Sequence, residues 1–281
     1  DTDRDPEHEI RDNVADLEAT GLELLSSGLP AARPDADPAS VVAQWEAAAA
    51  VTVHPVKQAI LGPFSAARNG SHVDTRRTAD AARRLIDALA DAGCGFVEIE
   101  EPDALSIAVV ASERRRFRDA HRRLTEALPA VHGSLAVSGG SVDGAGGETF
   151  FDLPYASYAF DLIAGPDNWR LIATAPAERG IVCGALDPAL RGDETRELLV
   201  WAAHYAASTA GRGLDRVGLA NAPSLIGLPR PVALRKLSRV AEAARIAAVE
   251  SSTEMASLLD ARAFGGRRER PGVVRLSGAD E

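Results

Sequence analysis

The sequence is poor in sulfur and in aromatic side chains, and these shortages exclude some classes of protein. Its 281 residues include two cysteines, one methionine and 5% aromatic residues. Cys94 and Cys183 lie far apart within apolar runs, where a free cysteine usually behaves as a small buried hydrophobic side chain. Two such residues do not make a disulfide scaffold, and a reducing cytoplasm is the expected compartment.

Long apolar runs and an excess of positive charge are also absent. No stretch reaches the roughly 20 apolar residues of a membrane helix. The acidic start from Asp1 to Glu9 lacks the basic and apolar regions of a signal peptide. Acidic residues exceed basic ones by 41 to 31, which gives a net charge of -10. This charge opposes attraction to phosphate backbones and anionic lipids, so we expect neither nucleic acid nor membrane partners.

What the sequence does contain is enough apolar residues for one sizeable core. The hydrophobic fraction is 46%, and α/β barrels commonly use about 250 residues for one domain. Helical patterns alternate with short apolar runs along the chain, an order that predicts a parallel sheet. We therefore expect an α/β protein with a single (β/α)8 TIM-type barrel over residues 1–261. Residues 262–281 are expected to form a C-terminal surface extension without an assigned function.

Periodicity and end signals predict the individual elements. The expected helices cover about residues 8–20 and 112–128, open at Pro38 and Pro231, and include the apolar stripes Ala82–Leu89 and Leu198–Tyr205. The expected strands are Leu22–Leu25, Val56–Leu61, Phe96–Glu100, Ala130–Val137, Tyr158–Ile163, Gly180–Leu186 and Arg216–Asn221. A closed barrel needs eight strands. Because the chain begins with a helix, we expect the first strand to be missing from the given chain or supplied unusually.

One segment interrupts this rhythm. Residues 138–147, SGGSVDGAGG, are too rich in glycine and serine to pack as a helix. We expect a mobile loop on the C-terminal side of the preceding strand. A lid over a site and a plainly disordered loop are both open alternatives.

The strand Phe96–Glu100 carries the strongest candidate residues. Side chains alternate across a strand, so Glu98 and Glu100 share one face while Val97 and Ile99 pack against the helices. Barrel enzymes build their sites at the C-terminal ends of the strands. The two carboxylates are therefore candidates for substrate binding (Glu98) and catalysis (Glu100), and a structural ion pair with an inward Lys or Arg is the alternative.

The next strand places a histidine on the same kind of face. Alternation puts His132, Ser134 and Ala136 together, and consecutive strands are usually neighbours. A histidine beside a carboxylate exchanges protons near neutral pH, so we expect His132 to share a hollow with Glu100. A buried histidine that serves packing is the competing interpretation.

Further polar residues follow later strands. Asp161 lies in SYAFDLI, Asp187 follows IVCGAL, Asn221 and Ser224 follow VGLA, and Arg230 is a candidate for binding an anionic group. Asp161 and Asp187 are taken as catalytic candidates, and the other three, with Ser134, as substrate-binding candidates. Together they place polar groups after five successive strands.

Several segments resemble the C-terminal catalytic barrel of cobalamin-independent methionine synthase. The resemblance rests on VKQAILGP, AGCGFVEIEEP, AVHGSLAVS, RGIVCGALD and the helix RPVALRKLSRVAEAA, and it spans about residues 10–248. It implies the barrel group that includes uroporphyrinogen decarboxylase. In that family a zinc ion held by one His, two Cys and one Glu activates a thiol for attack on a methyl group of methyltetrahydrofolate.

The resemblance also implies that the zinc ligands are replaced. The His-x-Cys pair matches Ser134 and Ala136, the Glu matches Asp161, and the last Cys falls near Ser224. The family's catalytic His falls on Ala189, although Asp187 is retained. The acid that contacts the amino group of the substrate matches Glu100, whereas its second acidic anchor matches SSGL near Leu29 and is lost.

The sequence thus predicts a methionine-synthase-like enzyme without a zinc–thiolate site. It would act on a small polar, amino-acid-like or thiol substrate by metal-free acid-base or positioning chemistry, with group transfer or a cofactor-free lyase reaction as the classes. No metal is expected, and a folate or other methyl donor is the candidate co-substrate. Open alternatives are conventional methyl transfer with an altered metal site, and a noncatalytic homologue that binds a ligand or a partner. A homodimer or a partner protein also stays open.

Overall fold

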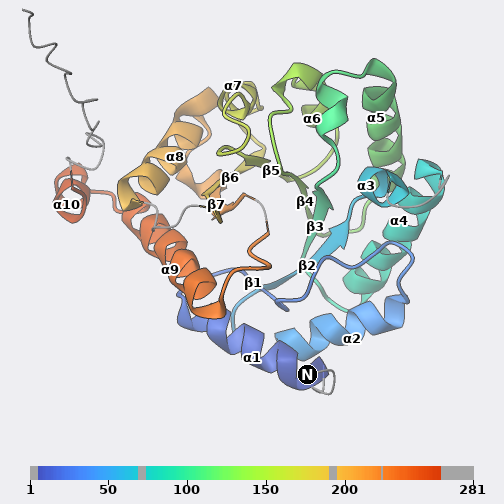
Figure 1. Ribbon diagram of the computed structural model, residues 1–281, viewed down its shortest axis with the longest axis horizontal. Helices are drawn as coiled ribbons and strands as arrows, with labels where there is room; N and C mark the ends of the chain where they lie inside the picture. Colours follow the sequence, from blue (N-terminus) through green and yellow to red (C-terminus); the bar gives the residue numbers. More distant parts are fainter. Residues whose placement is uncertain (1–5, 69–73, 190–194, 223, 261–281) are drawn as a thin grey trace, which may run out of the picture.

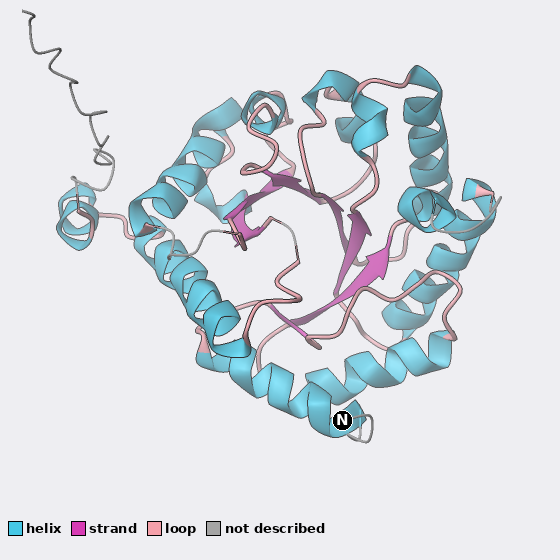
Figure 2. Ribbon diagram, viewed as in Figure 1, coloured by secondary structure: helices cyan, strands magenta, loops and turns pink. Residues whose placement is uncertain are grey.

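A computed structural model describes residues 6–68, 74–189, 195–222 and 224–260. The predicted extension at 262–281 lies outside these residues. Within them, seven parallel strands form one sheet in the order β1 to β7, so each strand pairs with the next one along the chain. The sheet curls into an incomplete ring, and the helices surround it (Figures 1 and 2). The predicted α/β fold of TIM-barrel type is confirmed.

The strands lie close to where alternation and turn residues predict them. They are β1 (Leu25–Ser26), β2 (Val56–Leu61), β3 (Phe96–Glu101), β4 (His132–Val137), β5 (Ser157–Asp161), β6 (Gly180–Leu186) and β7 (Val217–Asn221). The prediction for β1 was wrong by about three residues. Its position is set by pairing, because Leu25 stands opposite Val56, the first residue of β2.

The six predicted helices are present, and four short ones join them. They are α1 (Pro6–Ala19), α2 (Pro38–Ala49), α3 (Pro63–Arg68), α4 (Thr75–Asp91), α5 (Ala111–Thr125), α6 (Glu148–Phe151), α7 (Asn168–Ala173), α8 (Arg196–Ser208), α9 (Arg230–Ala247) and α10 (Ser252–Leu258). Local chemistry fixes their ends. The carboxylate of Asp37 accepts the Ser40 N–H at 3.1 Å before Pro38 opens α2, and Gly93, with φ of 95°, follows the end of α4.

The core lies between the sheet and the helices rather than inside the ring. Alternate residues of β2 and β3 are buried, and those between them are partly exposed. The buried set includes Ile60, Val97 and Ile99, which belong to the main apolar cluster. Inward positions such as Ala59 and Ala136 are small and remain partly exposed. The interior of a TIM barrel is ordinarily filled by bulky branched side chains, so this ring is less filled than usual.

The helix layer closes although the sheet does not. In the described part of the chain no ladder joins β7 to β1, yet α9 contacts α1. Arg230 at the start of α9 forms an ion pair with Asp16 and donates to Asn13 Oδ1 at 3.1 Å and to the Asp12 carbonyl at 3.0 Å. The predicted anion-binding role of Arg230 is therefore corrected, because its guanidinium is already bound to α1.

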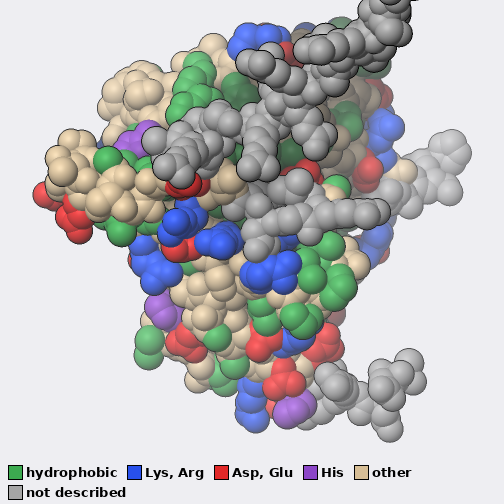
Figure 3. Space-filling model, turned by 60° about the vertical axis from the view of Figure 1, so that its left-hand side comes forward, with side chains coloured by type: hydrophobic (Ala, Val, Ile, Leu, Met, Phe, Trp, Pro, Cys, Tyr) green, Lys and Arg blue, Asp and Glu red, His purple; other side chains and the backbone are tan. Residues whose placement is uncertain are grey.

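The outer surface carries charges of both signs. Figure 3 shows Lys or Arg and Asp or Glu side chains interspersed on the face that is turned forward. Pairs such as Arg196 with Glu242, 3.0 Å apart, link α8 to α9. Exposed pairs of this kind contribute little to stability. No helix among the described residues is long and apolar enough to cross a membrane.

The Gly-rich segment after β4 is packed, which corrects the expectation that it lacks structure. Val142 and Ala145 are buried, and a 3-10 turn spans Asp143–Ala145. The buried side chain of Asn168 holds the segment. It accepts the Val142 N–H at 2.9 Å and donates to the carbonyls of Gly140 at 3.1 Å and Asp161 at 2.7 Å. These hydrogen bonds hold the Gly-rich segment in place of the regular backbone hydrogen bonds of a helix or strand.

Replacing Asn168 should therefore weaken the fold at this loop. Asn168→Ala leaves one N–H and two carbonyls without partners, and we expect the free energy of unfolding to fall by about 2–3 kcal/mol. Urea denaturation measures this change. Asp119→Ala, an exposed position on α5, is the control and should change stability by less than about 0.5 kcal/mol. Equal stability of the two variants would show that the loop is not held through Asn168.

Candidate active site

The candidate residues come from the C-terminal ends of neighbouring strands. Because all seven strands are parallel and pair in sequence order, the ends of β3, β5, β6 and β7 lie along the same edge of the sheet (Figure 1). Glu100, Asp161, Asp187 and Asn221 are at or beside these ends. The predicted edge is thus correct for four of the candidates, and their environments differ.

Glu98 and Glu100 face the interior of the ring, as alternation predicts. Their neighbours Val97, Ile99 and Glu101 are buried on the outer side, whereas Glu98 and Glu100 are partly exposed. Glu98 stands opposite Ala59 on β2 and Ser134 on β4. The two candidate carboxylates therefore lie two residues apart on one inner face.

Glu101, the last residue of β3, belongs to the outer layer and has a structural role. Its carboxylate accepts the N–H groups of Phe64 at 3.0 Å and Ser65 at 2.7 Å, and the Ser65 hydroxyl at 2.5 Å. His121 Nε2 lies 3.0 Å from Oε1 of Glu101. A Cβ on Gly62 would lie 2.2 Å from the same oxygen, so this position has room for glycine alone. The wholly buried Glu101 joins β3 to α3 and α5.

Glu98 forms the inward ion pair that was its alternative interpretation. Its Oε1 lies 2.6 Å from Lys57 Nζ on β2, and the two side chains are 13% and 25% exposed. Lys57 was not among the predicted site residues, although it lies within VKQAILGP. Alternation would have found it, because Lys57 shares its face with Ala59 and Leu61.

Glu100 differs from its neighbours in having no partner. Within the described residues no hydrogen bond or ion pair is made by its carboxylate. Burial raises its pKa above the ordinary 4.5, the nearby Glu98 carboxylate raises it further, and Lys57 partly offsets both effects. Glu100 is thus the inner carboxylate of β3 that is poised to take up a proton or a cationic group.

The predicted hollow shared by Glu100 and His132 was wrong. The register pairs Glu100 with Ala136 and Phe96 with His132, which places His132 four residues lower along β4. At about 3.3 Å per residue that is roughly 13 Å along the strand. His132 stacks on Phe96, with ring centroids 4.3 Å apart, and its Nε2 lies 2.8 Å from Ser157 Oγ. Desolvation lowers its pKa. The side chain is nevertheless exposed at the start of β4, so the buried packing role does not describe it either.

Ser134 faces inward on the same strand, beside Glu98. Its hydroxyl is fully buried and has no hydrogen-bond partner among the described residues. A buried polar group without a partner is unusual in a folded protein. Ser134 therefore adds a free donor and acceptor to the interior, one layer below Glu100.

Asp161 is buried at the end of β5 and its carboxylate is occupied. Oδ1 accepts the N–H groups of Ile163 at 2.9 Å and Ala164 at 2.8 Å, and Oδ2 accepts that of Gly139 at 3.0 Å. Asp161 thus joins its own loop to the Gly-rich segment. Three backbone N–H groups on one buried carboxylate are the geometry of a structural anchor.

Asp187 lies where β6 ends and contacts a buried lysine through its backbone. Its Oδ1 accepts the Ala189 N–H at 2.8 Å, which shapes the first turn of the loop. Lys236 on α9 is fully buried and donates to the Asp187 carbonyl at 3.0 Å. Lys236 was not among the predicted site residues, because the helical pattern alone does not show that this lysine points to the end of β6.

The remaining candidates are less buried. Asn221 ends β7 opposite Leu186. Ser224 is exposed and accepts the Ile226 N–H at 3.1 Å, so its hydroxyl stabilises a turn. In the described ranges, no group of three or more His, Cys, Asp and Glu side chains is arranged to hold a metal ion.

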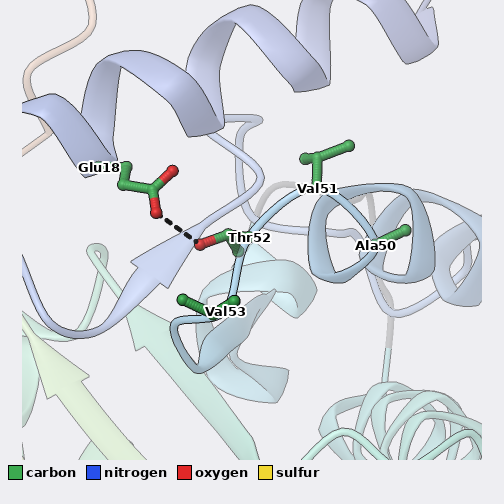
Figure 4. Close-up of a pocket in the computed structure, with 5 residues that line it drawn as sticks. All are labelled: Glu18, Ala50, Val51, Thr52 and Val53. Carbon is green, nitrogen blue, oxygen red and sulfur yellow. Dashed lines mark hydrogen bonds between the residues drawn. The ribbon is translucent and has the colours of Figure 1, made fainter.

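Two hollows lie at the opposite end of the ring. One has a volume of about 290 Å³ and is lined by Glu18 and residues 50–53 (Figure 4). In Figure 4 the Glu18 carboxylate at the end of α1 points to the Thr52 hydroxyl, 3.4 Å away. The other, about 430 Å³, is bordered by Trp45, His54 and Phe96 among others. Both adjoin the loop that precedes β2, away from Glu100.

Solved structures show the same fold. No family model matches the sequence, and no curated protein matches it. A protein of Listeria monocytogenes assigned as a vitamin-B12-independent methionine synthase is 16% identical, with 85% of this chain and 86% of that one covered and a TM-score of 0.69. A B12-independent methionine synthase of Shewanella sp. W3-18-1, in complex with selenomethionine, is 15% identical, with 86% and 87% covered and a TM-score of 0.71.

A more distant likeness is a methyltransferase from Methanosarcina mazei, which is 13% identical, with 73% of this chain and 63% of that one covered and a TM-score of 0.52. At these identities the likeness concerns the fold. The fold is that of the cobalamin-independent methionine synthase barrels, as the sequence resemblance predicted.

Proposed function

We propose that this protein is a group-transfer enzyme, related to the methionine synthase barrels, that binds a small substrate through its amino group at Glu100. The observation that carries the proposal is the difference among the buried acids. Glu98 has Lys57, Asp161 has three backbone N–H groups and Glu101 has a full set of donors. Glu100 alone among these four faces the interior without such a partner.

Charge balance supports a cationic ligand group at this place. Lys57 and Glu98 neutralise each other, so an ionised Glu100 adds a net negative charge to the inner face. A partly buried carboxylate without a partner is costly, and an ammonium group at hydrogen-bond distance removes that cost. The family resemblance points the same way, because its amino-binding acid matches Glu100. The partner proposed is thus a small molecule with a primary amine.

The proposed enzyme works without zinc, because the matching residues do not fit the ion. Zinc prefers thiolate, imidazole and free carboxylate ligands. Ser134 offers a neutral hydroxyl and Ala136 offers no donor atom, which leaves the Asp161 carboxylate, itself bonded to three backbone N–H groups, as one ligand where zinc needs three or four. A methyl donor that already carries a good leaving group is therefore the proposed co-substrate, since such a group reduces the need for thiol activation. A folate would serve only if its methylated nitrogen were first protonated.

Ligand-dependent stability tests the substrate class. A panel of amino acids and amino thiols, each paired with the analogue that lacks the amino group, is added in thermal melts. An amine that binds should raise the melting temperature of the protein by a few degrees at saturating concentration, whereas the analogue without the amino group should not. Glu100→Gln should abolish the shift, and Glu46→Gln, an exposed position on α2, should keep it. Equal shifts with and without the amine would contradict the proposal.

The raised pKa of Glu100 predicts a specific pH dependence of stability. In the folded protein Glu100 keeps its proton to higher pH than in the unfolded chain. Its contribution is therefore favourable below about pH 4.5 and is lost as pH rises through the folded value. Relative to Glu100→Gln, the native protein should lose stability over that window and then level off. Urea denaturation at a series of pH values measures the difference, and a constant difference would refute it.

Metal analysis tests the zinc-free proposal. After equilibration with Zn²⁺ and gel filtration, the protein should retain far less than one zinc per chain. Plasma mass spectrometry gives the stoichiometry. One tightly bound zinc that disappears in Asp161→Asn would show that the interior holds the metal after all.

A further inference from the structure

The basic residues of this chain are almost all arginines. Of the 31 lysines and arginines, only Lys57 and Lys236 are lysines. Neither lies on the outer surface: Lys57 faces the interior of the ring, and Lys236 is fully buried against the end of β6. The ammonium group of lysine is a compact point charge, whereas the guanidinium group of arginine is broad and planar. Arg212 is buried as well, so the two lysines are distinguished by their places beside β3 and β6 rather than by burial alone.

Lys57 is placed to act on one particular pair of acids. It lies on β2 with its ammonium 2.6 Å from Glu98 Oε1, and Glu98 lies two residues below Glu100 on the same face of β3. The groups that face Glu100 from the neighbouring strands can be named. Leu61 on β2 and Ala136 on β4 stand opposite Glu100, and Ser134 lies one layer below. Lys57 lies lower on β2, and its side chain reaches Glu98. Among these groups, Glu98 and Lys57 are the charges that bear on Glu100.

We propose that Lys57 is a positioning residue: by holding the Glu98 carboxylate, it leaves Glu100 as the inner acid that exchanges a proton and receives the cationic group of the substrate. Without Lys57, two carboxylates on one face would repel each other, and one of them would stay protonated. With it, the Glu98 carboxylate is held in an ion pair, and Glu100 is the inner acid of β3 without a carboxylate partner among the described residues. The substrate part of this inference rests on the proposed function, but its test needs no ligand.

The test measures the titration midpoint of Glu100 in four backgrounds. In each, the free energy of unfolding is compared with that of the matching Glu100→Gln variant across pH, and the midpoint of the difference is recorded. Lys57→Met, which keeps length and removes charge, should move the midpoint up by about one pH unit. Glu98→Gln should move it down by a similar amount. The double variant, Lys57→Met with Glu98→Gln, should stay near the native midpoint.

Two controls keep the test decisive. Lys57→Arg keeps the charge and should keep the midpoint, whereas a purely structural role would make it behave like Lys57→Met. If Lys57→Met does not fold, two other proteins are compared. The titration midpoint of Glu100 must then be higher in the double variant than in Glu98→Gln alone. A midpoint that stays unchanged or falls when Lys57 is removed overturns the proposal. Movement of the midpoint without any amine binding would instead leave Lys57 as proposed and contradict the substrate class.

Discussion

The constraint on which the structure depends is the pairing of seven parallel strands in sequence order. Parallel pairing brings every strand end to one edge, and alternation divides each strand into an outer set and an inner set. The outer set, such as Val97 and Ile99, is buried under the helices. The inner set is partly exposed and mixes the small residues Ala59 and Ala136 with the charged residues of β2 and β3. Stability is therefore built outside the ring, and the interior is left for polar chemistry.

The acids around the ring show how environment decides the role of one side-chain type. Glu101 faces outward and its carboxylate is filled by donors from α3 and α5. Asp161 ties two loops together through backbone N–H groups. Glu98 is paired with Lys57, and among these acids Glu100 is the one whose carboxylate has no partner within the part of the chain that the structure describes. The first two maintain the scaffold, and the inner pair on β3 is where we propose that a ligand binds.

The helix layer compensates for the open sheet. Arg230 ties α9 to α1 where no strand ladder joins β7 to β1. Its guanidinium binds a carboxylate, an amide and a carbonyl, a set of acceptors that suits the fork of arginine. Arg230, an anion-binding candidate in the sequence, thus serves to join two helices of the outer layer. The interpretation of Asp161 changes in the same way: predicted to be catalytic, it has the contacts of a structural anchor.

The sequence by itself determined the alternation of helices and strands, the bounds of β2 and β6, and the inward direction of Glu98 and Glu100, because these follow from local periodicity. Only the tertiary structure decided how far along the barrel each side chain lies and which groups it contacts. His132 shares a face with Ser134 and Ala136 in the sequence, yet the register with β3 places it about four residues below Glu100. Asn168 and Lys236 acquire their roles from contacts with distant segments. A period of two gives the face of a residue, whereas the offset between strands is set by packing and hydrogen bonding across the sheet.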